Sequence, residues 1–173
     1  TGTASIRRID PGFVALGVAS MLNDQTGWSL GGTQRFGRST SLRLDVARQR
    51  DNLAGQKAFT TNRDRYGAVL NFRPLQRLVT SARLQYVGMD NGLGGGDARW
   101  ISYANWLAST TQTLSFGRDA LLRAVSVGYT YRGSGDQNPA RAASSMDAHA
   151  TTAPVVLAPS QNLRITPSIG LLH

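Results

Sequence analysis

Hydrophobic and polar residues alternate along much of this chain, which is the period-two pattern of a strand whose two faces meet different surroundings. The pattern is clearest in the stretch Leu42-Arg43-Leu44-Asp45-Val46, where three apolar side chains share one face and two charged ones share the other. Gln34 and Gln112 interrupt the apolar face of two other stretches. We therefore expect an all-β protein. Further alternating stretches lie at residues 28–36, 66–72, 78–86, 125–131 and 163–171.

Short turns and long loops alternate between these stretches. The short turns recur about every 40 residues, each after an apolar residue. They are predicted at Phe36-Gly37-Arg38-Ser39, Phe72–Arg77, Phe116-Gly117-Arg118-Asp119 and Leu157-Ala158-Pro159-Ser160. The long loops are polar and rich in Gly, Asn and Asp, as solvated connections are. They are predicted at Arg48–Arg65, Asp90–Arg99 and Arg132–Ala148, and a shorter connection, Asn23–Gly27, joins a strand at Phe13–Met21 to one at Trp28–Phe36.

This sorting of connections resembles the bacterial outer-membrane β-barrel superfamily, whose members have short periplasmic turns on one rim and longer extracellular loops on the other. The resemblance covers residues 12–172, and the stretch LNFRPLQRLVTSARLQYVGMDN, with its Phe-Arg-Pro turn and alternating return strand, is similar to large porin-like barrels. It implies an antiparallel up-and-down transmembrane β-barrel, or a multi-strand segment of a larger barrel, in the outer membrane of a Gram-negative envelope. It assigns no particular family.

We expect a single domain over residues 1–173 with about nine strands, residues 99–116 fitting either one long strand or two pieces. Bacterial single-chain barrels normally have an even number of strands. A fragment of a larger barrel, or a barrel shared with other chains, therefore fits the count. The opening TGTASIRRID has no Met, so either a leader has been removed or the chain starts inside a longer protein. The closing SIGLLH stops in the middle of an apolar alternation, which favours truncation there too.

Composition narrows the class of protein. Apolar residues make up 40% of the chain, below the roughly 45–50% of soluble globular domains, so a large dry core is hard to build. No stretch approaches the roughly 18 consecutive apolar residues of a membrane-spanning helix. The absence of Cys excludes disulfides, thiolate metal sites and Cys nucleophiles.

The formal net charge of +9 raises the question of nucleic acid, because clustered Lys and Arg neutralise phosphates. The cations are 18 Arg and a single Lys, Lys57, and the Arg are spread from Arg7 to Arg164 without a dense run. We therefore expect no nucleic acid. The expected partners are outer-membrane lipid and either other subunits of an envelope complex or further copies in a homo-oligomer.

Two sets of side chains are candidates for function. Aromatic residues near the ends of the apolar rows are expected at the two membrane interfaces, where amphipathic rings are favoured. They are Phe36, Phe72 and Phe116 on the short-turn side and Trp28, Tyr66, Tyr86, Tyr129 and Tyr131 toward the long loops. Arg on the polar faces would attract anions in a water-filled pore, or would form a packed internal ladder with Asp. The pore-lining candidates are Arg43, Asp45, Arg83, Gln85 and Arg164.

Catalysis and metal binding are not expected. His149 lies near Ser145 and Asp147, but adjacent side chains of an extended segment point to opposite faces and do not readily converge on one nucleophile. The Gly run at residues 94–96 has oxygen-bearing neighbours, yet their spacing matches no defined calcium loop. No cofactor is expected.

The leading expectation is a non-enzymatic outer-membrane pore, or a membrane scaffold component of a larger envelope assembly. The alternative is a soluble, secreted all-β binding module that recognises a glycan or a protein through its long loops. That alternative requires a second sheet to cover the apolar rows.

Overall fold

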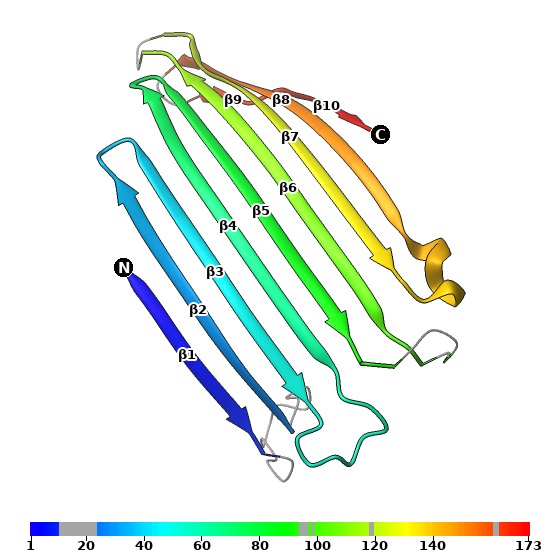
Figure 1. The fold of residues 1–173 in the computed structure, drawn as a ribbon. Helices are drawn as coiled ribbons and strands as arrows, with labels where there is room; N and C mark the ends of the chain where they lie inside the picture. Colours follow the sequence, from blue (N-terminus) through cyan, green and yellow to red (C-terminus); the bar gives the residue numbers. More distant parts are fainter. Residues whose placement is uncertain (11–23, 94–96, 98, 118–119, 161–162) are drawn as a thin grey trace.

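The computed structural model is one twisted antiparallel sheet, a single layer thick (Figure 1). It describes residues 1–10, 24–93, 97, 99–117, 120–160 and 163–173. The strands are β1 (Gly2–Ile9), β2 (Gln25–Phe36), β3 (Thr40–Asp51), β4 (Asn62–Leu75), β5 (Leu78–Asp90), β6 (Ser102–Ser115), β7 (Leu122–Asp136), β8 (Met146–Ser160), β9 (Leu163–Ile165) and β10 (Ser168–Leu172). A short 3-10 helix, η1 (Pro139–Ser144), joins β7 to β8.

The order of the strands in the sheet is their order in the sequence. Each strand from β1 to β8 pairs with the next, and both β9 and β10 return along β8. The two ends of the chain therefore lie at opposite edges of the sheet (Figure 1). This arrangement confirms the all-β, antiparallel, up-and-down architecture. The described strands do not close into a barrel.

The connections differ at the two ends of the strands, as the sequence predicts. Residues 37–39 and 76–77 join neighbouring strands at one end, and residues 52–61, 91–101 and 137–145 join them at the other. We call these the short-turn end and the long-loop end. Gly37 has a φ of 63°, a left-handed backbone that Gly adopts without a steric penalty, which explains why the first turn falls where it does.

The predicted turn at residues 157–160 is wrong. Strand β8 continues to Ser160, and the return strand begins at Leu163. The register between β8 and β9 shifts between Leu157 and Ser160. Pro159 cannot donate a hydrogen bond, so it is tolerated at this irregularity rather than marking a turn. In the third predicted turn, residues 118–119 lie outside the described residues.

The strands are longer and the loops shorter than predicted. Strands β3 and β4 extend the pairing to Asp51 and Asn62, and β7 continues to Asp136. Within residues 99–116, Ser102–Ser115 form the single strand β6 rather than two pieces. Strand β1 was not expected, and the predicted strand at residues 13–21 lies outside the described part of the chain.

The sheet has almost no interior. Among the described residues, Ile9 is the one apolar side chain that is buried, with 6% of its surface exposed. Nothing else in the described chain packs across either face of β2 to β7 (Figure 1). No helix in the described residues has the length and hydrophobicity to cross a membrane.

Candidate functional site

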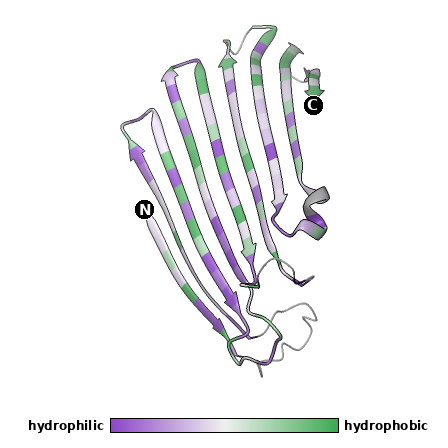
Figure 2. Ribbon diagram, turned by 45° about the vertical axis from the view of Figure 1, so that its right-hand side comes forward, coloured by the Kyte–Doolittle hydropathy of each residue, from purple (hydrophilic) through white to green (hydrophobic). Residues whose placement is uncertain are grey.

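The register gathers most of the large apolar side chains of β2 to β6 on one face of the sheet, while the other face carries Arg43, Arg83 and Gln85 together with Val69 and Leu107. Strand-to-strand pairing places Leu44, Ala68, Leu84 and Ala108 in one row, directly across from one another. Their sequence neighbours lie on the other side, because successive residues of a strand alternate. Figure 2 shows this alternation as purple and green bands along the strands. We call the two sides the apolar face and the polar face.

An aromatic row crosses the apolar face near the long-loop end. Tyr66, Tyr86 and Trp106 are register partners on β4, β5 and β6. The ring centroids are 5.7 Å apart between the tyrosines and 4.4 Å apart between Tyr86 and Trp106. Trp106 was not among the predicted aromatics, although its alternation with Ala104 and Ala108 places it on this face. Its side chain is 56% exposed.

Charged residues follow directly beyond this row. Arg48 and Asp64 pair across β3 and β4 on the same face, with an Nε to Oδ1 distance of 3.4 Å. Trp28 is the register partner of Arg48 and lies at the same level. The apolar face thus ends at the aromatic row, and a solvated ion pair follows it.

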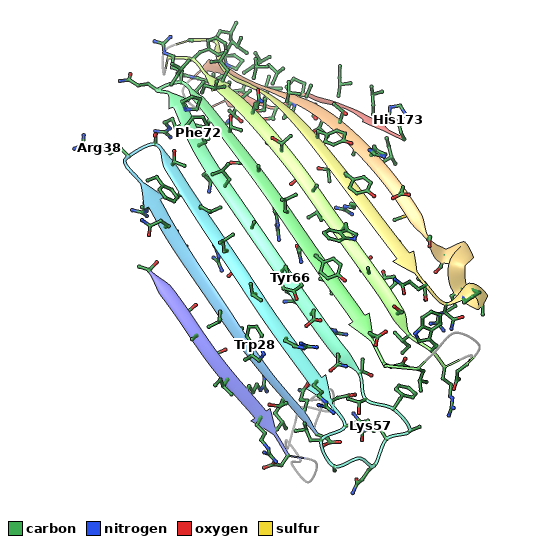
Figure 3. All side chains as sticks on the ribbon, viewed as in Figure 1. Trp28, Arg38, Lys57, Tyr66, Phe72 and His173 are labelled. Atoms are coloured by element: carbon green, nitrogen blue, oxygen red, sulfur yellow. The ribbon has the colours of Figure 1, made fainter. Side chains whose placement is uncertain are left out.

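A second aromatic level lies at the short-turn end. Phe36 and Phe72 belong to one row, both opposite Thr40. Figure 3 shows Phe72 near this end, while Trp28 and Tyr66 lie toward the end that carries Lys57. The predicted aromatic Phe116 follows β6 here, where its amide donates to the Arg123 carbonyl at 2.7 Å.

The height of the apolar face can be worked out from the register. On β5, eight residues separate Tyr86 in the aromatic row from Leu78 beside the short turn. That is about 26 Å along a strand, or about 20 Å along a barrel axis for strands tilted by about 40°. Transmembrane barrels carry an apolar band about 25 Å tall, which is about 5 Å more than this height.

Polar groups interrupt the apolar face on β7 and β8. Tyr131 donates to Asp147 Oδ1 at 2.7 Å, and Tyr129 Oη lies 2.6 Å from His149 Nδ1. The Tyr131 and His149 rings are 5.1 Å apart. The two tyrosines lie one and two rows closer to the short turns than Tyr66, because β7 runs past the predicted start of its loop at Arg132.

The polar face holds four of the five pore-lining candidates together. Arg43 donates two hydrogen bonds to Asp45, from Nε to Oδ2 at 2.9 Å and from Nη2 to Oδ1 at 3.1 Å. Arg83 lies in the same row as Arg43, two strands away, and its Nη2 donates to Gln85 Oε1 at 3.1 Å. The fifth candidate, Arg164, lies on β9 at the far edge of the sheet.

These side chains line a groove of about 370 Å³ on the polar face. Two glycines keep it open beside Asp45. A Cβ on Gly31 would lie 2.9 Å from Asp45 Oδ1, and one on Gly67 would lie 3.7 Å from Asp45 Cβ. Arg65 also lines the groove. It was missed because residues 48–65 were predicted to be a loop, although its position two before Gly67 on β4 fixes its face.

Hydroxyl pairs lie elsewhere on the polar face. Ser5 and Ser29 share a hydrogen bond of 2.7 Å across β1 and β2, and Thr113 and Ser126 share one of 2.9 Å across β6 and β7. Short hydroxyl side chains satisfy one another across strands. They keep this part of the polar face wettable.

The side chains of Asn52 and Asp97 form hydrogen bonds within the long loops. Asn52, with a φ of 59°, donates to the carbonyls of Lys57 and Phe59 and accepts from the Lys57 amide at 2.8 Å. Hydrogen bonds from the side chain and backbone of Arg99 lower the pKa of Asp97 to about 2. These carboxylate and amide oxygens therefore already accept hydrogen bonds from their own loops.

Metal ligands do not gather in the described residues, where no three His, Cys, Asp or Glu side chains come together. The Gly run at residues 94–96 lies outside the part of the chain that the structure describes. Asp147 and His149 do share a face, being two residues apart on β8, but Asp147 accepts from Tyr131 and the His149 ring lies at hydrogen-bond distance from Tyr129.

Neither a model of a known protein family, nor a curated protein, nor a solved structure matches this chain.

Proposed function

We propose that this chain forms part of the wall of a β-barrel in the outer membrane of a Gram-negative bacterium, with its apolar face toward lipid and its polar face toward a water-filled lumen. The barrel serves as a pore for small polar solutes, and its role is binding and passage rather than catalysis.

One observation carries the proposal. The apolar side chains of β2 to β7 form a face, interrupted by polar groups on β7, against which nothing else in the described chain packs. Large exposed apolar patches mark surfaces that meet lipid or another protein. A lipid environment accounts for the aromatic rows of this face at two levels and for the ion pair beyond the aromatic row.

Backbone hydrogen bonding also supports the proposal of a membrane barrel. In hydrocarbon every backbone N–H and C=O needs an internal partner, and an antiparallel sheet supplies one for every inner strand. The edges at β1 and β10 need neighbouring strands from elsewhere in the barrel. Those neighbours belong either to the same protein or to other subunits of an envelope assembly.

Partitioning and conductance test the proposal in sequence. The full-length protein is expected to remain with outer membranes in high-salt and alkaline washes and to require detergent for extraction. After reconstitution in planar bilayers it is expected to give stepwise ion currents. A protein that stays with the membrane but conducts no ions would have the scaffold role instead.

A soluble, secreted binding module is the second candidate, and the exposed aromatic row of Tyr66, Tyr86 and Trp106 favours it, since flat aromatic platforms suit sugar rings. The row lines a groove of about 580 Å³ on the apolar face. Extraction of the full-length protein into buffer without detergent would support this module and overturn the membrane proposal.

A further inference from the structure

The arginines of the polar-face groove divide into two kinds. Arg43 is held by Asp45 through two hydrogen bonds, and this is the bidentate geometry that satisfies a guanidinium most fully. Asp45 is the one carboxylate among the residues that line the groove. Arg43 and Asp45 therefore act as an internal ladder with no net charge.

In the described part of the chain, Arg65 and Arg83 form no ion pair with a carboxylate. Arg83 donates to Gln85, a neutral amide, and none of the six ion pairs among the described residues includes either arginine. Both side chains are exposed and line the same groove. The groove thus keeps two positive charges that protein carboxylates do not neutralise.

The register sets how far apart these charges lie. Arg65 pairs with Val87, and Arg83 pairs with Val69. The two Cα atoms are therefore on adjacent strands and offset by four residues, which is about 14 Å. Arginine side chains reach several ångströms toward each other from that spacing, so one small anion can lie between both guanidinium groups. Gly67 lies between them in the strand, and the Asp45 carboxylate that Arg43 neutralises lies beside it, with Oδ2 4.0 Å from where a Cβ on Gly67 would be.

We propose that Arg65 and Arg83 form an anion-binding site in the lumen, which makes the pore select small oxyanions such as phosphate and carboxylates. The inference rests on the proposed pore. A guanidinium presents a planar pair of donors that matches the oxygen atoms of these anions. Of the three arginines that line the groove, Arg43 pairs with Asp45, which leaves Arg65 and Arg83 to bind the anion.

Ion selectivity tests the site. A unit charge about 8 Å from the ion path in water changes the local concentration of a monovalent ion by about twofold. The change has opposite signs for anions and cations. Wild-type channels should therefore prefer chloride over potassium in a salt gradient. Salt screening reduces the effect, so Arg83→Gln and Arg65→Gln should each lower the chloride-to-potassium permeability ratio by about two- to fourfold.

Two further variants sharpen the result. Asp45→Asn frees Arg43 and should raise the permeability ratio by a similar factor. Arg38→Gln removes the same charge at a short turn, outside the groove, and should change the ratio far less. Inorganic phosphate should inhibit the chloride current of the wild type, and this inhibition should weaken at least tenfold in the Arg65→Gln, Arg83→Gln double variant.

The possible failures are distinct. A reconstituted protein that carries no current overturns the pore and the anion site together. A conducting pore that prefers cations, or whose selectivity and phosphate inhibition do not change in the Arg65 and Arg83 variants, overturns the anion site and leaves the pore standing. Circular dichroism and membrane insertion, measured on each variant, separate loss of the site from loss of the fold.

Discussion

The orientation of the two faces can be tested with a pair of adjacent, identical residues. Thr110 lies on the apolar face of β6, between Ala82 and Tyr129, and Thr111 lies on the polar face, between Ser81 and Gly128. Replacing each with Arg introduces the same side chain at neighbouring positions of one strand. Only the face differs.

The depth of Thr110 follows from the register. It lies four residues from Trp106 in the aromatic row, about 13 Å along the strand and about 10 Å along the barrel axis. That is near the middle of the apolar band. An Arg on the lipid face at this depth costs about 2–4 kcal/mol. Thr111→Arg should cost less than about 1 kcal/mol, since small side chains flank it and the proposed lumen is hydrated.

Reversible denaturation in lipid vesicles, followed by tryptophan fluorescence, measures both free energies of unfolding. The expected difference between the two variants is about 2–3 kcal/mol, with Thr110→Arg the less stable. Equal stabilities within about 0.5 kcal/mol, or a larger cost for Thr111→Arg, would refute the assignment of lipid and lumen faces. In a water-soluble protein studied without detergent, the cost of the introduced Arg would not depend on its depth in a membrane.

Three further predictions concern local contacts. Asn52→Ala removes the side chain that closes its loop and should make that loop at least several-fold more sensitive to limited proteolysis, because three backbone groups lose their partner. Asp97 should titrate at about pH 2 when its carboxyl carbon is followed by NMR; a lowered pKa means that its bond to Arg99 stabilises the loop above about pH 4 and is lost as the pH falls through about 2. Gly31→Ala should lower stability by about 1 kcal/mol, measured by thermal unfolding, because its Cβ would press on the Asp45 carboxylate.

Each of these has its own check. An unchanged proteolysis pattern would show that other contacts order the loop of Asn52. A titration of Asp97 near pH 4 would contradict its bond to Arg99. Gly67→Ala is the control for Gly31→Ala, since its Cβ has ordinary contact distances and little loss of stability is expected. Equal effects of the two alanines would exclude crowding at Asp45 as the cause.

The alternation of side chains predicted the faces of the sheet because a strand allows no other arrangement. Leu42, Leu44 and Val46 share a face with Leu84 and its neighbours, as the sequence indicated. Gly37 likewise fixed the first short turn. These features depend on local backbone geometry, which a single stretch of sequence determines.

The ends of the strands could not be predicted in the same way. Polar residues such as Arg48 and Arg65 were taken as the start and end of a loop, but pairing continues through both of them. A change from apolar to polar side chains marks where the surroundings become aqueous, whereas hydrogen bonding between strands depends on the partner strand. For the same reason, Arg65 could not be placed in the groove before the register was known.

The direction of the two edge strands has a consequence for how the proposed barrel would be completed. Strand β1 runs from the short-turn end toward the long-loop end, and so does β10. Joining one edge to the other directly would create a parallel seam, and so would a ring of identical copies in one orientation. A ring in which every neighbour is antiparallel must therefore contain, besides the strands described, an odd number of further crossings between β10 and β1.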